Sequence, residues 1–156
     1  MTGNQPSELD GLKAKRMTPH TMEASTPPLF LAPMAGVTDL AYRILARECG
    51  ADLTVTEFTA ASGLTRKNTY SWLKVESDPR ESPFIPQIFG GITEEMVQTV
   101  EMLQDRADVI DINFGCPAPK VCRNDAGAAL LRDPDRVVSM VRACIDATEV
   151  PITVKM

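Results

Sequence analysis

The sequence predicts an α/β protein and, within that class, about the first five strands of a TIM (β/α)8 barrel. Short apolar runs alternate with segments of helical period along most of the chain. The runs are apolar throughout, which is typical of parallel strands covered by helices. No Gly-x-Gly-x-x-Gly motif follows the first run, so a barrel is favoured over a Rossmann-like sheet. Because a closed barrel needs eight strands, we expect this barrel to be incomplete, with two uncovered edges that favour association.

The composition is that of an ordinary globular domain, with 156 residues, 44% hydrophobic and 24% charged. A net charge of -5 argues against a broad nucleic-acid-binding face, so any RNA contact is expected to be local. The four cysteines match neither a disulfide framework nor a paired zinc spacing, which predicts a reducing, cytoplasmic setting and no metal. No apolar run has the length of a membrane span, and no hydrophobic signal core is present.

Residues 1–28 precede the first apolar run and are rich in Thr, Ser, Pro and charged residues without a period. This composition predicts a flexible tail. Lys13, Lys15 and Arg16 could contact phosphate, but a merely solvated tail is the favoured interpretation. We therefore expect a tail over 1–28 and one domain over 29–156.

The first strand is predicted at residues 29–32 and the second at residues 53–58. Between them, Thr38-Asp39 supplies a helix cap and Gly50 a stop signal. The residues that would share one face of this helix are Leu40, Ala41, Ile44 and Leu45. The less regular stretch that follows has three breakers, Gly63, Pro79 and Pro83.

The third strand is predicted at residues 84–89, ending at Gly90-Gly91, and the fourth at residues 109–113. Thr93 is expected to cap the helix between them, which carries acidic residues in its positive first turn. The apolar stripe predicted to be buried on this helix is Met96, Val97, Val100 and Leu103.

The last predicted helix has Asp133 as its cap and Pro134 at its first position. The apolar residues that recur at helical spacing along it are Val137, Val138, Val141 and Ile145. A fifth strand is predicted at residues 152–156.

The fourth strand ends on the polar residue Asn113, and a single thiol, Cys116, follows in a loop. Gly115, Pro117 and Pro119 are expected to keep this loop from being helix or strand. A free cysteine is most often a small buried hydrophobe, but its flanking Gly and Pro make a packing role less favoured here. Ligands of α/β proteins bind at this carboxyl edge of the strands. We therefore expect chemistry at this loop.

Residues in or just after the predicted strands, several of them polar, recur at the same edge in successive units, and in a barrel these positions converge. They are Pro33, Met34, Ala35, Glu57, Gln87, Asn113, Cys116 and Lys155. Each has a structural alternative: Met34 as a core filler, Gln87 as a polar barrel-layer residue, Lys155 as a solvated strand end. Glu57 is either a supporting partner or a stray strand carboxylate.

Five motifs together resemble the tRNA-dihydrouridine synthases over the whole chain from about Leu29. The motifs are residues 32–39, 86–90, 111–121, 126–134 and 154–156. The resemblance implies an FMN-dependent TIM barrel followed by a small helical domain, which reduces particular uridines of tRNA with NADPH.

The resemblance also assigns roles. It places the Pro33-Met34-Ala35 backbone and Gln87 against the flavin ring, and Lys155 beside it, where a cation stabilises reduced flavin. Asn113 would orient flavin or uracil. Cys116 would be the acid that protonates C5 of an extruded uracil after hydride reaches C6, a role that suits a thiol because most thiols are protonated at neutral pH.

Some features depart from the family or leave alternatives open. Asp125 stands where family members usually carry glycine, so the backbone angles of its turn are open. The family's phosphate-binding loops and basic helical domain are not found, so the expected site holds only the ring side of FMN. A basic and aromatic group in residues 66–74 would suit RNA, but packing of Trp72 and Leu73 under a surface segment is favoured. The rival interpretations are another FMN barrel acting on a free pyrimidine or enone, and a catalytically inactive short product.

Overall fold

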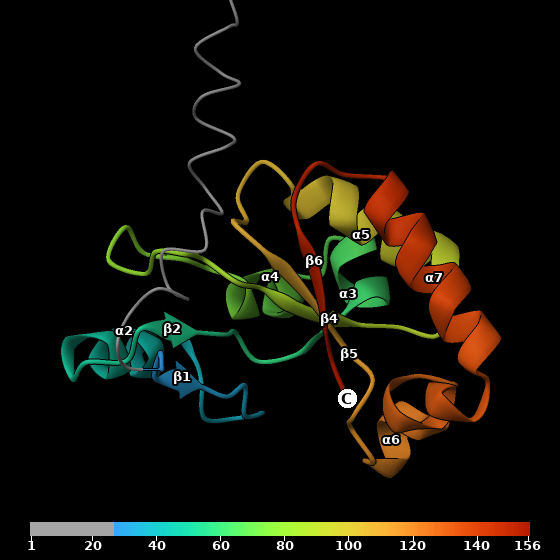
Figure 1. The fold of residues 1–156 in the computed structure, drawn as a ribbon, viewed down its shortest axis with the longest axis horizontal. Helices are drawn as coiled ribbons and strands as arrows, with labels where there is room; N and C mark the ends of the chain where they lie inside the picture. The colour runs from blue at the N-terminus through green and yellow to red at the C-terminus, as the bar shows by residue number, and fades with distance from the viewer. Residues whose placement is uncertain (1–26) are drawn as a thin grey trace, which may run out of the picture.

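The structure, a computed structural model, describes residues 27–156. Two parallel sheets run through this part of the chain. The smaller sheet pairs β1 (Phe30–Leu31) with β2 (Leu53–Thr54). The larger sheet has the order β3 (Thr59–Ala60), β4 (Gln87–Phe89), β5 (Ile110–Asn113) and β6 (Ile152–Lys155). Every pairing is parallel, which confirms the predicted α/β class (Figure 1). Closure into a barrel stays a prediction, and of the predicted tail only positions 27 and 28 lie within the described residues.

The second strand was expected to be continuous over residues 53–58, and this prediction is wrong. β2 ends at Thr54 and β3 begins at Thr59. The segment between them stays attached to its neighbour, since the backbone N–H of Thr56 donates to the carbonyl of Ile85 at 3.1 Å. The regular ladder is interrupted because the Thr56 hydroxyl oxygen, not a backbone carbonyl, accepts the N–H of Gln87 at 3.0 Å.

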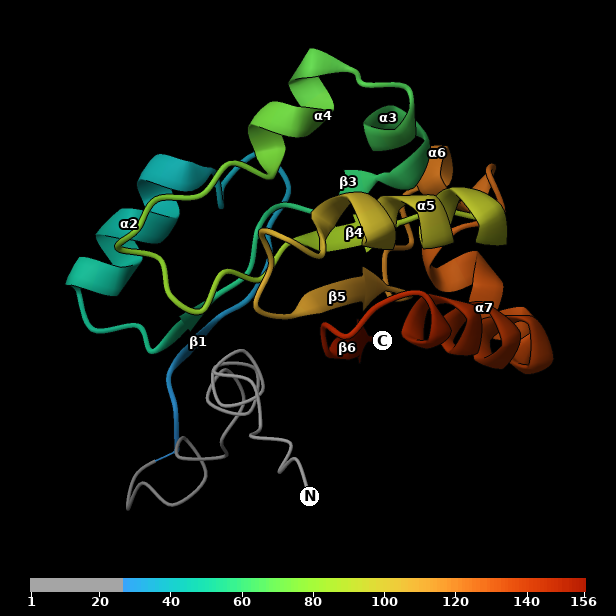
Figure 2. The same cartoon turned by 90° about the horizontal axis from the view of Figure 1, so that it is seen from above.

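The longer helices are α2 (Leu40–Glu48), α5 (Thr93–Leu103) and α7 (Pro134–Asp146). The shorter ones are α3 (Ala61–Thr65), α4 (Thr69–Lys74), α6 (Pro119–Cys122) and the 3-10 helix η2 (Gly127–Arg132). In Figure 2, α2, α3 and α4 lie above the strands, and α7 lies to the right of β5 and β6. The short helices were not predicted, because one or two turns are too short to show an apolar period. The expectation that Pro119 excludes helix is wrong, since α6 begins at Pro119, and proline is tolerated at the first position of a helix.

Two of the three predicted helix caps are observed. Asp39 and Asp133 each accept a backbone N–H of the first turn of their helices, α2 and α7, at 2.9 and 3.1 Å. The expected cap at Thr93 is wrong, since Thr93 is already the first residue of α5 and Ile92 before it makes no side-chain cap. α2 ends at Glu48, two positions before the predicted stop at Gly50, which has a φ of +100°.

The main core lies between the larger sheet and the helices. On α5 the predicted stripe is confirmed, with Met96, Val100 and Leu103 fully buried and Val97 packed beside them. On α7 the prediction is partly wrong, because Val138 and Ile145 are 50% and 51% exposed. The residues of α7 that face the core are Val137, Met140, Val141 and Cys144. These positions follow the i, i+3, i+4, i+7 pattern of one helix face. Met140 and Cys144 therefore face the core, and Val138 and Ile145 do not.

Helix α2 covers the smaller sheet incompletely. Ile44 is buried, as predicted, but Ala41 and Leu45 are exposed. Leu45 borders an apolar groove that it shares with the exposed residues Leu29 and Phe30 at β1. β1 has no neighbour on its other side among the described strands, so this part of the predicted core is open.

The two faces of the larger sheet differ in chemistry. The face toward α5 and α7 is apolar, with Ile88, Ile110 and Ile112 fully buried. The opposite face begins with a small apolar cluster of Val55, Ile85 and Val109. Toward the carboxyl ends of the strands the same face becomes polar, because Gln87, Asp111 and Asn113 occupy the next alternate positions.

Candidate active site

A line of hydrogen-bonded side chains crosses the larger sheet from β4 to β5 and reaches the carboxyl end of β5 at Asn113. The amide nitrogen of Gln87 on β4 donates to Oδ2 of Asp111 on β5 at 2.6 Å. The amide nitrogen of Asn113 donates to Oε1 of Gln87 at 3.1 Å. All three side chains are buried, so two strands are joined here by a dry polar network.

Asn113 also fixes the loop that carries the thiol. Its side-chain oxygen accepts the backbone N–H of Gly115 at 3.2 Å and that of Cys116 at 2.9 Å. An asparagine that binds the backbone two and three residues ahead stabilises a tight turn. The strand-end amide therefore holds the first residues of the loop, and the half-buried Cys116 lies next to the polar network.

The other side of the Cys116 loop rests on η2. The carbonyl of Cys116 accepts the backbone N–H of Ala128 at 3.0 Å and the thiol of Cys122 at 3.6 Å. Gly127 has a φ of +59°, and a Cβ there would lie 2.7 Å from the same carbonyl. Glycine is thus required at 127 both by its backbone angle and by the closeness of the loop.

Lys155 lies beside this network on β6. It is the register partner of Asn113, and its carbonyl accepts the backbone N–H of Phe114 at 2.8 Å. Register partners of parallel strands project from the same face, as the neighbouring pair Asp111 and Thr153 shows by bonding at 2.6 Å. The Lys155 side chain is exposed, and its ammonium group has no ion-pair or hydrogen-bond partner among residues 27–156.

The segment Pro33–Ala35 follows β1 and leads into a turn over residues 35–37, in which the backbone N–H of Val37 donates to the carbonyl of Met34 at 3.1 Å. Thr38 closes the turn, since its hydroxyl accepts the N–H of Met34 at 3.0 Å and lies 3.2 Å from the carbonyl of the same residue. The carboxylate of Glu57 accepts the N–H of Gly36 and lies 3.5 Å from the ammonium of Lys74. Glu57 therefore supports the turn, which agrees with the supporting role considered for it.

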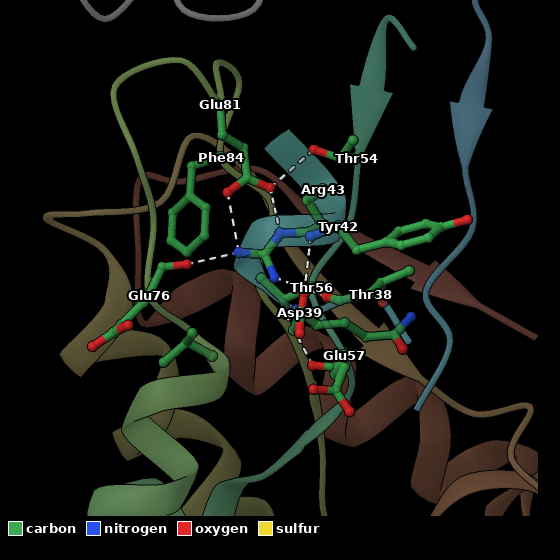
Figure 3. Close-up of polar contacts among 12 residues, drawn as sticks. Thr38, Asp39, Tyr42, Arg43, Thr54, Thr56, Glu57, Glu76, Glu81 and Phe84 are labelled. Atoms are coloured by element: carbon green, nitrogen blue, oxygen red, sulfur yellow. Dashed lines mark hydrogen bonds and ion pairs between the residues drawn. The ribbon is translucent and has the colours of Figure 1, made fainter. Parts of the chain in front are cut away.

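A buried ion pair anchors the far end of the same turn (Figure 3). The guanidinium of Arg43 bonds the carboxylate of Glu81, which also accepts the hydroxyl of Thr54 at 2.9 Å. Arg43 donates in addition to the carbonyls of Thr38 at 2.9 Å and Glu76 at 2.7 Å. The guanidinium thus fixes the backbone of Thr38, whose side chain holds Met34.

The structure shows which backbone angles Asp125 adopts in the turn before η2. Asp125 has a φ of +48°, in the left-handed region that favours glycine. Its side chain is exposed, and its backbone N–H donates to the carbonyl of Cys122 at 3.1 Å. The turn therefore keeps glycine-like geometry with an aspartate in place.

The basic and aromatic segment of residues 66–74 divides into an anchored and an exposed part. Trp72 packs against the main core and its indole N–H donates to the carbonyl of Leu64 at 3.3 Å, as the packing interpretation predicted. Leu73 is 52% exposed, so the same prediction is wrong for it. Tyr70 is exposed and lies under the ammonium of Lys74 at 5.2 Å.

Outside this network, residues 27–156 contain one fully buried thiol. Cys144 is fully buried in the core, and burial raises the pKa of its thiol to about 11. Within residues 27–156, no group of three or more His, Cys, Asp or Glu side chains could hold a metal ion. The same part of the chain contains no helix of the length and apolarity that a bilayer crossing requires.

The donors at this edge fit the pyrimidine side of a flavin ring. That side carries carbonyl oxygens and ring nitrogens, which accept hydrogen bonds and gain negative charge on reduction. The amide nitrogen of Asn113 uses one of its two hydrogens within the network, and the ammonium of Lys155 has no described partner. Two nitrogen donors, one of them cationic, therefore stand at neighbouring register positions.

Two residues of this site were not singled out from the sequence. Asp111 and Thr153 join the network through the 2.6 Å bonds given above. The signal was available, because Asp111 precedes Asn113 by two positions in a strand and must project from the same face. Thr153 relates to Lys155 in the same way.

Comparison with known proteins agrees with the resemblance seen in the sequence. The family model for dihydrouridine synthase matches residues 30–156. A probable tRNA-dihydrouridine synthase of Rhizobium leguminosarum bv. phaseoli is 40% identical over 127 residues, covering 81% of this chain and 40% of the relative. The tRNA-dihydrouridine synthase B of Pseudomonas aeruginosa is 39% identical over 145 residues, covering 90% of this chain and 42% of the relative.

A third relative gives the same picture. The tRNA-dihydrouridine synthase B of Klebsiella pneumoniae is 40% identical over 129 residues, covering 82% of this chain and 40% of the relative. The chain thus spans about two fifths of the length of the curated relatives it matches. Because the family model matches nearly all of the described residues, the chain belongs to the dihydrouridine synthase family.

Proposed function

We propose that this chain carries the ring-binding and proton-donating half of an FMN-dependent enzyme that reduces uridine to 5,6-dihydrouridine in tRNA with NADPH. The observation that supports this most strongly is the attachment of the Cys116 loop to the Gln87–Asn113 network at the strand ends. The relatives' names supply the substrate. The net charge of -5 agrees with RNA contacts confined to a small area, and the location is taken to be cytoplasmic.

In this proposal the ring of FMN lies against the segment Pro33–Ala35 and the donors Gln87, Asn113 and Lys155. FMN, when bound, supplies hydride taken from NADPH. Lys155 places a positive charge beside the pyrimidine edge, which favours the reduced state. Asn113 offers its second amide hydrogen to a carbonyl of flavin or uracil.

Cys116 is the proposed acid. Hydride added to C6 of uracil leaves an enolate, whose electron pair is available at C5. The thiol donates the proton that bonds to C5 and forms the second new C–H bond. The thiolate left behind regains a proton from solvent, which can reach the half-buried loop. A uridine must leave its stack to come within contact distance of this thiol.

The proposal is tested by the modified base itself. We expect tRNA from cells that lack the gene to lose dihydrouridine at one or more positions, and expression of the complete gene to restore it. Unchanged dihydrouridine in the deletion strain would refute the proposal and favour an FMN barrel that acts on a free pyrimidine or enone. A purified protein without flavin absorbance would favour the inactive short product.

A further inference from the structure

The direction of every hydrogen bond in the polar network can be deduced, starting from the Cys116 loop. The side-chain oxygen of Asn113 faces two backbone N–H groups, those of Gly115 and Cys116. Backbone N–H groups can only donate, so the oxygen of the amide must be the atom that faces them. The amide nitrogen of Asn113 then necessarily points toward Gln87.

The orientation of Gln87 on β4 follows from that of Asn113. Because the Asn113 nitrogen donates at 3.1 Å, the atom of Gln87 that it meets must be the carbonyl oxygen. The nitrogen of Gln87 is then turned toward Asp111, 2.6 Å away. The line can end here only on a group that accepts, and an ionised carboxylate accepts at both oxygens.

Thr153 on β6 is the last member of the network and bonds Asp111. Its hydroxyl lies 2.6 Å from the second carboxylate oxygen of Asp111 and donates to it. Gln87 is fully buried, and Asp111 and Asn113 are each 8% exposed, so water cannot readily replace a lost partner. A change of donor direction at one end would therefore leave buried groups unpaired along the whole line.

From this geometry we infer that Asp111 is a positioning residue that fixes Gln87, with its nitrogen toward the carboxylate and its oxygen toward the amide nitrogen of Asn113, which the Cys116 loop already orients. This inference rests on the proposed function, and it identifies what the site selects: a planar ring that presents carbonyl acceptors to Asn113. With Gln87 reversed, the nitrogen of Asn113 would face another donor and would lose the acceptor that holds it. Asp111 acts through Gln87 and Asn113, and contact with the ring is not part of its role.

The choice of substitution separates orientation from charge. In Asp111→Asn, the new side-chain oxygen can accept from Gln87 while the new nitrogen donates to the Thr153 hydroxyl, so every bond of the line has a counterpart. In Asp111→Ala, the Gln87 nitrogen has no acceptor and the Gln87 amide is free to reverse. A reversed Gln87 would turn its nitrogen toward the nitrogen of Asn113, which the N–H groups of Gly115 and Cys116 hold in place. The matched control is Thr99→Val, which removes a fully buried hydroxyl of α5 on the opposite side of the sheet, bonded to Glu95 at 2.8 Å.

The experiment uses the protein expressed from its complete gene, with two readouts. The first is the side-chain amide NMR signals of Gln87 and Asn113, recorded without cofactor. The second is the dissociation constant for FMN. We expect Asp111→Ala to shift or broaden both amide pairs and to weaken FMN about tenfold or more, the effect of one misdirected hydrogen bond. Asp111→Asn should keep the amide signals and bind FMN within about threefold of the unaltered protein.

Two results would overturn the inference. One is an Asp111→Ala protein that keeps both amide signals and binds FMN as Thr99→Val does. The other is an Asp111→Asn protein as impaired as Asp111→Ala, which would make the charge, and not the orientation, the important property. Failure of the proposed function is seen separately, as absence of dihydrouridine formation by the unaltered protein, and the amide signals test the orientation regardless of that outcome.

Discussion

Arg43 on α2 and Glu81, which precedes β4, form an ion pair through two bonds of 2.5 and 3.1 Å, with side-chain exposures of only 1% and 0%. The pair joins a helix to a loop 38 residues later in the chain. Removing one partner would leave the other as a buried, uncompensated charge. Such a loss typically costs about 3–5 kcal/mol.

We therefore predict that Arg43→Met lowers the free energy of unfolding by roughly 3–5 kcal/mol in urea denaturation. The matched control is Arg80→Met, because Arg80 also pairs with two carboxylates but is exposed at 62%. Surface pairs contribute about 0–1 kcal/mol, so this control should change little. Equal losses in the two variants would show that the buried pair has no special role.

Asp125 is expected to be a site where glycine stabilises the protein. A non-glycine residue in the left-handed region costs about 1–2 kcal/mol, while glycine costs roughly 0.5–1 kcal/mol in the entropy of the unfolded chain. Asp125→Gly should therefore raise the free energy of unfolding by about 0.5–1 kcal/mol. The measurement is again urea denaturation.

The control for this substitution is Arg123→Gly two positions earlier. Arg123 has a φ of -65° in the right-handed helical region, where glycine has no conformational advantage. This variant should be destabilised by about 0.5–1 kcal/mol. If both glycine variants shift stability in the same direction, the backbone angle of Asp125 does not explain the effect.

The buried thiol of Cys144 predicts a pH dependence of stability. Burial raises its pKa in the folded protein from 9.0 to about 11, so the folded state binds the thiol proton more tightly than the unfolded state does. The stability that this provides is complete below pH 9 and is lost as pH rises toward 11. We expect Cys144 to account for a loss of about 1 kcal/mol between pH 7.5 and pH 10.

The check compares unfolding of the unaltered protein and Cys144→Ala at the two pH values under reducing conditions. The variant is less stable at pH 7.5 because it leaves a small cavity, and its deficit should shrink at pH 10 by the amount stated. A deficit that is independent of pH would show that the thiol titrates alike in the folded and unfolded states.

The α/β class and the longer elements could be predicted from the sequence because each carries a periodic apolar pattern or a helix-cap residue. The stripe of Met96, Val100 and Leu103 and the caps at Asp39 and Asp133 are examples. Prediction failed where tertiary contacts override local pattern. The strand over residues 53–58 is broken because Thr56 and Glu57 direct their side chains to distant backbone groups, which no local pattern reveals.

The candidate site was predictable in its position but not in its connections. Asn113, Cys116 and Lys155 each end or follow a strand, and parallel strands bring such positions to one edge. Gln87 lies within the predicted third strand and is the first residue of β4. Hydrogen-bond direction depends on coordinates, however, and the sequence placed Asp111 in a motif without giving it a role. The support of Pro33–Ala35 by Thr38 and Glu57 likewise links segments that no periodic signal connects.

The central claim is that Cys116 protonates uracil at the edge formed by Gln87, Asn113 and Lys155. The most direct measurement is the rate at which tRNA lacking dihydrouridine reoxidises the reduced, FMN-loaded protein in a single turnover, compared among the unaltered protein, Cys116→Ala and the exposed-cysteine control Cys49→Ala. We predict that Cys116→Ala binds FMN normally but reacts about 100-fold or more slowly, as expected for loss of a general acid, while Cys49→Ala reacts at the unaltered rate. An undiminished rate in Cys116→Ala would contradict the account.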